Sequence, residues 1–156
     1  MKFDRLLLKD FVTLASGAFG FLAIVLAVAS YWTAALFVGF AAVLDFLDGK
    51  VARHTGKHNA FGRELDSLSD AVAFGAAPAF AAFTLQAASP FYWLYAASAV
   101  VFLAAALVRL ARFNLYASAA KGVFYGIPAP AAAVMLVVLA PVLGVYSPVA
   151  FLGLGA

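Results

Sequence analysis

The sequence predicts an all-α protein whose helices form a polytopic transmembrane bundle. Hydrophobic residues make up 67% of the chain and charged residues 11%, and the mean hydropathy is +1.04. Soluble domains of ordinary composition carry about 25% charged residues. The charges are also unevenly distributed, because residues 11–44, 71–108 and 122–156 contain no acidic or basic side chain. A chain of 156 residues has room for one membrane domain, expected to cover 1–156.

The apolar runs predict five full spans and a short sixth, since about 20 apolar residues cross the hydrocarbon core. An amphipathic interfacial helix is expected before them at 1–10, where apolar residues are set against charged ones: Phe3, Leu6, Leu7 and Leu8 against Lys2, Asp4, Arg5 and Lys9. Pro148 would open the sixth helix, but the nine residues from there to Ala156 reach only about 13 Å. That helix is therefore a half-span or marks a shortened C-terminus. The five full spans are expected at 11–29, 33–53, 62–86, 91–116 and from Pro128 onward.

Turn and interface signals separate these runs. Residues 30–32 (Ser-Tyr-Trp) are expected to form a tight outer turn, and the polar residues 54–59 a cytoplasmic loop. Residues 89–90 (Ser-Pro) turn the chain before the fourth run, which opens with aromatic residues typical of a membrane interface. Pro128 suits the first turn of the fifth helix, where its missing N–H costs nothing.

The basic residues predict the orientation. They fall in three clusters that alternate with uncharged loops, which is the positive-inside pattern of a protein with a cytoplasmic N-terminus in the cell membrane. The net charge of +3 therefore indicates topology and contact with lipid headgroups rather than nucleic acid. The clusters are Lys2, Arg5 and Lys9; Lys50, Arg53, Lys57 and Arg63; and Arg109, Arg112 and Lys121.

Four aspartates lie at helical spacing within this apolar chain. Asp45 and Asp48 are three residues apart and Asp66 and Asp70 four apart, so each pair shares one helical face. The short loop between the two helices makes them antiparallel neighbours, which places all four acids at one depth below the cytoplasmic surface. A charged Asp at the bilayer centre costs about 2.5–3.5 kcal/mol. Divalent cations are the natural compensation for four such charges.

The chemistry of the donors narrows the kind of site. Hard carboxylate oxygens suit Mg²⁺, Mn²⁺ or Ca²⁺ rather than a soft metal, and two ions would offset four negative charges. Gly49, Ala52 and Gly62 leave room for a ligand against the backbone, and Arg53 offers a fork of donors suited to phosphate. Together these residues predict a pocket for a metal-bound pyrophosphate.

The pattern D-x2-D-G-x2-A-R-x8-G-x3-D-x3-D resembles the signature of the CDP-alcohol phosphotransferase family, and residues 45–70 match it without a gap. The flanking segments 61–79, 109–114 and 126–130 look like the phosphatidylserine synthase branch or its archaetidylserine counterpart. Ala71 stands where phosphatidylglycerophosphate synthases tend to carry Lys. Residues 9–13 (Lys-Asp-Phe-Val-Thr) depart from the Pro-Asn-x-x-Thr stretch of many members.

The resemblance implies transfer of a phosphatidyl or archaetidyl group from a CDP-linked lipid to the hydroxyl of L-serine, with release of CMP. It implies a homodimer that uses two divalent cations, Mg²⁺ or Mn²⁺, with Ca²⁺ as a non-productive occupant. Asp45, Asp48 and Asp66 would hold the first ion, and Asp66 and Asp70 the second. Asp70 is also the candidate general base. The nucleotide and its phosphates would contact Gly49, Ala52, Arg53 and Gly62.

The acceptor site is less well defined by the sequence. Arg109 and Arg112 share a helical face near the cytoplasmic end of the fourth run, so either could bind the serine carboxylate or act as a topology anchor. Asn114 and Lys121 are weaker candidates. Glycerol 3-phosphate or an inositol phosphate could replace serine as the acceptor. A cation transporter is a more distant alternative, because transporters usually place such acids at the bilayer midplane between repeated halves.

Overall fold

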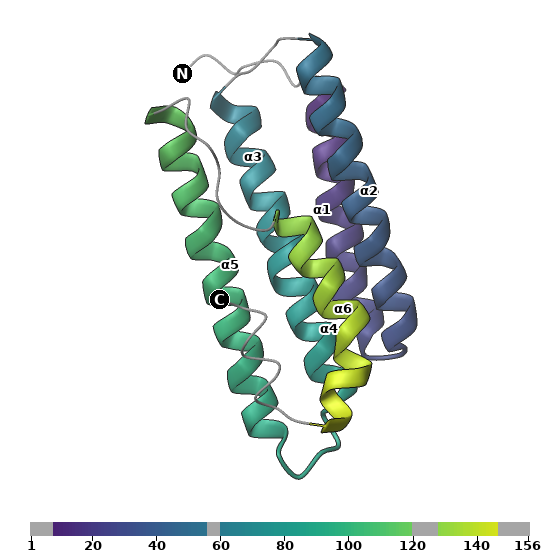
Figure 1. Cartoon of the computed structure of the whole chain (residues 1–156). Coiled ribbons are helices and arrows are strands. Elements are labelled where there is room, and N and C mark those ends of the chain that lie inside the picture. Colours follow the sequence, from purple (N-terminus) through teal and green to yellow (C-terminus); the bar gives the residue numbers. More distant parts are fainter. Residues whose placement is uncertain (1–7, 56–59, 120–127, 147–156) are drawn as a thin grey trace.

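The protein is a bundle of helices in which each segment that crosses the bundle runs opposite to the one before it (Figure 1). The computed structural model describes residues 8–55, 60–119 and 128–146. The all-α prediction is confirmed. The helices are α1 (Leu8–Ala27), α2 (Tyr31–Thr55), α3 (Ala60–Asp70), the π-helix η1 (Ala71–Ala76), α4 (Ala77–Leu85), α5 (Tyr92–Ala119) and α6 (Ala129–Tyr146).

Three of the described helices are long and apolar enough to cross a membrane. They are Asp10–Ala27, Tyr92–Leu115 and the continuous rod Phe61–Leu85, which joins α3, η1 and α4. Two shorter apolar helices, Tyr31–Leu47 and Ala129–Val142, accompany them. The chain therefore has the helices of a multi-pass membrane protein.

Several predicted boundaries move. Residues 8–10, expected in a separate interfacial helix, belong to α1, while residues 1–7 and the expected sixth helix lie outside the described residues. The outer turn is earlier than predicted, because Tyr31 already belongs to α2. Ser30 explains the shift: its Oγ accepts a hydrogen bond from the N–H of Thr33 (3.4 Å) and so caps the helix.

Small residues let the helices approach closely, and alanines make up most of the buried core. The closest approach joins α1 to η1, where a Cβ on Gly20 would lie 2.4 Å from Cα of Ala73. One turn further toward Asp66 along the rod, a Cβ on Gly17 would lie 3.1 Å from Oγ of Ser69. The helix α1 thus packs directly behind the rod that carries Asp66 and Asp70.

A hydrogen bond between α2 and α6 lies next to a proline. Pro141 lies inside α6 and has no N–H, so the carbonyl of Val137, four residues earlier, loses its helical donor. The buried hydroxyl of Tyr31 in α2 donates a hydrogen bond to that carbonyl. An interhelical bond thereby replaces the bond that the proline removes.

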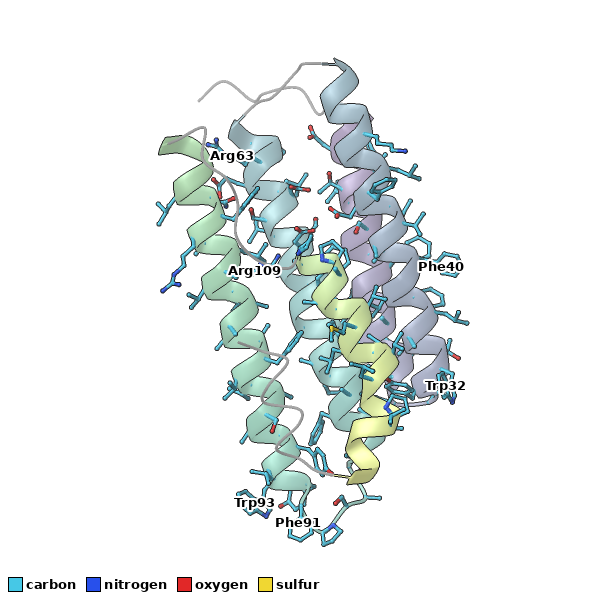
Figure 2. All side chains as sticks on the ribbon, viewed as in Figure 1. Trp32, Phe40, Arg63, Phe91, Trp93 and Arg109 are labelled. Carbon is cyan, nitrogen blue, oxygen red and sulfur yellow. The ribbon has the colours of Figure 1, made fainter. Side chains whose placement is uncertain are left out.

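The two ends of the bundle differ in their side chains (Figure 2). Trp32, Phe91 and Trp93 lie at one end and are exposed, as interfacial aromatic residues are. Arg63 lies at the opposite end, where α2 ends and α3 begins. This polarity matches the predicted arrangement of aromatic residues and cations.

Candidate functional site

Three of the four predicted aspartates converge between two helices. Asp45 of α2 and Asp66 and Asp70 of α3 each offer a carboxylate oxygen, and these oxygens lie within 4.8 Å of one another. All three side chains are half-buried. Oxygen atoms gather between these helices in the half of the bundle that carries Arg63 (Figure 2).

This cluster fits a hard divalent cation. Carboxylates so close together repel one another unless a positive charge lies between them. Divalent cations of the Mg²⁺, Mn²⁺ and Ca²⁺ class take oxygen ligands at about 2.0–2.6 Å, so oxygens on opposite sides of one ion are about 4–5 Å apart. The observed separation of 4.8 Å or less therefore suits a shared ion, and the all-oxygen donor set favours these metals.

The remaining predicted motif residues differ in how far the structure describes them. The helix α2 continues through Asp48, Ala52 and Arg53, whose side chains lie outside the described residues. Gly62 in α3 is buried. Gly49 faces open space, since a Cβ there would meet nothing within 4 Å, but so does Gly39 in the middle of the same helix. Open space alone therefore does not identify a nucleotide site.

A π-helix follows the last aspartate of the motif. η1 begins directly after Asp70, and the N–H of Ala77 donates to the carbonyl of Val72, five residues back. Pro78 gives the physical reason, because it has no N–H for the carbonyl of Phe74 and its ring crowds that carbonyl. The wider turn changes the register of the rod at the acid cluster. Such π segments are frequent at functional sites, and the sequence reasoning missed this one, although Pro78 was its signal.

The two arginines expected to share a face have different surroundings. Arg109 is half-buried and interacts electrostatically with Asp70. Its side chain extends from α5 toward the acid-bearing rod (Figure 2). Arg112 is exposed. Lys121, the other cation considered for the acceptor, lies outside the described residues.

A polar pair next to the acids joins α3 to α5. Ser67 Oγ donates to Oδ1 of Asn114 (3.1 Å), and Nδ2 of Asn114 donates to Ser67 Oγ (2.8 Å). Both side chains are half-buried. Sequence reasoning gave Asn114 only a weak role and no role to Ser67. The signal was present, because Ser67 directly follows Asp66 and a polar Asn is costly within an apolar helix.

Comparison with known proteins identifies the family. The sequence model of the CDP-alcohol phosphatidyltransferases matches residues 6–155, which is nearly the whole chain. The chain belongs to the CDP-alcohol phosphatidyltransferase family. The resemblance noted in the motif and its flanking segments is thereby confirmed, and among the described residues the acid cluster could hold a divalent cation.

Curated relatives carry related names. A CDP-diacylglycerol–serine O-phosphatidyltransferase of Methanocaldococcus jannaschii is 39% identical over 130 residues, which cover 83% of this chain and 58% of the relative. An archaetidylserine synthase of Methanothermobacter thermautotrophicus is 36% identical over 132 residues, covering 83% of this chain and 55% of the relative. A Helicobacter pylori CDP-diacylglycerol–serine O-phosphatidyltransferase is 43% identical over 96 residues, covering 61% of this chain and 40% of the relative. The chain thus spans little more than half the length of the first two.

Proposed function

We propose that this phosphatidyltransferase transfers a phosphatidyl or archaetidyl group from a CDP-linked lipid to L-serine and releases CMP. The carboxylate cluster of Asp45, Asp66 and Asp70 supports phosphoryl-transfer chemistry with divalent cations. The names of the relatives from Methanocaldococcus jannaschii and Methanothermobacter thermautotrophicus support serine as the acceptor. Family membership favours transfer over the alternative of cation transport.

The proposed reaction breaks the phosphoanhydride bond of the CDP-linked lipid and forms a phosphoester bond to serine. The serine hydroxyl oxygen forms a bond to the lipid-side phosphorus, the bond from that phosphorus to the bridging oxygen breaks, and CMP leaves with the bridging oxygen. Asp70 accepts the hydroxyl proton. Because a metal-bound carboxylate is a weak base, the orientation and charge of Asp70 contribute more than its proton affinity.

We propose for the aspartates the roles that the family resemblance implies. Asp45, Asp48 and Asp66 would hold one divalent cation, and Asp66 and Asp70 a second. When bound, these ions supply charge neutralisation and a template for the pyrophosphate. Mg²⁺ or Mn²⁺ is the proposed cofactor. Gly49, Ala52, Arg53 and Gly62 remain the proposed contacts of the nucleotide and its phosphates.

The structure favours Arg109 over Arg112 as the residue that binds the acceptor carboxylate. Arg109 is half-buried and within electrostatic reach of Asp70, so one small molecule could contact both side chains. A guanidinium group binds a carboxylate through two parallel hydrogen bonds. The exposed Arg112 instead suits contact with lipid headgroups.

The membrane arrangement is part of the proposal. We place the acid cluster and the N-terminus on the cytoplasmic side, with five crossing helices in one domain. The exposed arginines near the cluster and the aromatic residues at the opposite end support this orientation. We also propose a homodimer, because few residues of the long α5 are buried within one chain.

A competition experiment tests the acceptor. The purified protein receives CDP-diacylglycerol, Mn²⁺ and equal concentrations of serine, glycerol 3-phosphate and inositol phosphate, and the lipid products are measured by mass spectrometry. We expect the serine lipid to predominate, with one CMP released per lipid formed. Predominance of either phosphorylated product would contradict the proposed acceptor. A parallel reaction with a CDP-linked ether lipid distinguishes the phosphatidyl from the archaetidyl donor.

A further inference from the structure

Two of the contacts between α5 and the rod that carries Asp66 and Asp70 lie on either side of Asp70. One is apolar: a Cβ on Gly75 would lie 3.1 Å from Cδ1 of Leu103 and 3.7 Å from Cβ of Ala106. The other is the doubly hydrogen-bonded pair of Ser67 and Asn114. The first brings the backbone of η1 against α5, and the second connects α3 to α5 nearer the α2–α3 connection.

Both contacts fit a single antiparallel alignment of the rod with α5. Eight residues separate Ser67 from Gly75 on one rod, and eight separate Ala106 from Asn114 on the other. Each interval corresponds to about 12 Å of helix. Asp70 and Arg109 both lie within these intervals, so the two contacts flank the place where Arg109 approaches Asp70.

Apolar packing of α5 weakens toward the acid cluster. Tyr95, Ser98 and Phe102 are buried in the lower half of the helix. Around the cluster, Arg109 and Asn114 are only half-buried. α5 packs chiefly against η1 and α4, so the Ser67–Asn114 pair is a main link between α5 and α3 at this level. A hydrogen-bonded pair in apolar surroundings fixes a helix spacing because leaving its groups unpaired is costly.

We propose that Ser67 and Asn114 are positioning residues that set the distance between α3 and α5 and thereby the width of the acceptor site. The inference rests on the proposed function, in which a small acceptor carrying a hydroxyl and a carboxylate lies between Asp70 and Arg109. Such an acceptor must contact both side chains at once, so its affinity depends on the spacing of the two helices. The CDP-linked lipid, held by the acids of α2 and α3, does not depend on that spacing.

Kinetics test the inference through two Michaelis constants. Ser67→Ala and Asn114→Ala should each raise the KM for serine about tenfold, the effect of losing a hydrogen-bonded pair, with little change in the KM for the CDP-linked lipid. The double variant should have the same raised KM for serine as either single variant, because each single substitution already removes the Ser67–Asn114 link. Ser67→Thr keeps the hydroxyl and should retain a near-normal KM for serine.

Ser98→Ala is the matched control. Ser98 is buried in α5, but its Oγ donates within its own helix to the carbonyl of Leu94 (2.8 Å). Its removal should leave both KM values unchanged. An unchanged KM for serine in Ser67→Ala and Asn114→Ala, or an equal rise in both KM values, overturns the inference.

A distance measurement tests the link without any acceptor. The chain contains no cysteine, so Leu68→Cys and Val108→Cys introduce unique sites for spin labels at exposed positions of α3 and α5. Asn114→Ala should lengthen or broaden the distance distribution between the labels, and an unchanged distribution overturns the inference. If the wild-type protein releases no CMP with serine, the proposed function fails, while this distance still tests the link.

Discussion

Asp70 ends α3, belongs to the acid cluster and interacts electrostatically with Arg109. Because of these three properties, we propose that Asp70 contacts both a divalent cation and the acceptor. Asp66, one turn earlier, also belongs to the acid cluster, but the residue after it, Ser67, pairs with Asn114 of α5. The two neighbouring acids therefore have different expected roles, and single substitutions can separate them.

Substitution of Asp70 tests the catalytic step. Asp70→Asn keeps the size of the side chain but removes its charge and basicity, so CMP release should fall at least about 100-fold, the lower range for general acid–base catalysis. The measurement is CMP released from CDP-diacylglycerol and serine, with folding checked by size-exclusion chromatography in detergent. Glu64→Gln is the matched control, because Glu64 is an exposed acid of the same helix. Full activity of Asp70→Asn rules out its role.

Arg109 and Arg112 form a second matched pair. Arg109→Ala should raise the KM for serine at least about tenfold, because a charge-assisted bond to a carboxylate contributes about 1.5–3 kcal/mol. Arg112→Ala should leave that constant within about twofold, since its side chain is exposed. Initial rates at varied serine concentration measure both. Equal effects of the two substitutions would contradict the assignment of Arg109 to the acceptor carboxylate.

At the scale of helices, the Tyr31 hydroxyl on α2 compensates for Pro141 on α6. Tyr31→Phe leaves the carbonyl of Val137 without that donor and should lower the free energy of unfolding by about 1 kcal/mol. Pro141→Ala restores an N–H to α6 that can donate to the carbonyl of Val137. Tyr31→Phe should therefore lower the free energy of unfolding by less in the Pro141→Ala protein than in the wild-type protein. Thermal unfolding in detergent of the four variants of this cycle measures the coupling. An identical cost in both backgrounds would show that the two residues act independently.

Because α1 packs so closely against η1, we expect opposite effects on stability when Gly20 and Gly39 are replaced by alanine. Gly20→Ala places a Cβ 2.4 Å from the backbone of Ala73, so the helices must separate, at a cost of about 1–3 kcal/mol. Gly39→Ala meets nothing within 4 Å and should be neutral or stabilising by up to about 1 kcal/mol, since alanine is the better helix former. Unfolding temperatures in the same detergent compare them. A stable Gly20→Ala protein would contradict the close approach of these helices.

Helix locations followed from the sequence because apolar runs and charge-free intervals define them directly. The details of individual helices did not, since they depend on groups that meet only after folding. Ser30 starts α2 two residues before the expected position through its side-chain cap. The π-helix after Asp70 arises from Pro78, whose effect on the rod depends on how the preceding turn can relax.

At the scale of the whole molecule, the acids of one motif come together because α1 packs against both α2 and α3, which run antiparallel (Figure 1) and carry Asp45 on one side and Asp66 and Asp70 on the other. Spacing along the sequence was sufficient to predict that Asp45, Asp66 and Asp70 converge, and the structure brings their oxygens within 4.8 Å. Spacing was not sufficient to predict that Arg109 is half-buried and Arg112 exposed, because their burial depends on the packing of α5 against η1 and α4. Nor could it pair Ser67 with Asn114, which are 47 residues apart.

The central claim is that carboxylates from α2 and α3 together hold divalent cations. Electron paramagnetic resonance of Mn²⁺ titrated into the purified protein tests it most directly, because bound and free Mn²⁺ give different spectra. Saturable binding is expected for the wild-type protein and for Glu64→Gln. Asp45→Asn and Asp66→Asn, one change on each helix, should each weaken binding at least about tenfold, the loss of one charged ligand. Wild-type affinity in both of these variants would contradict the claim.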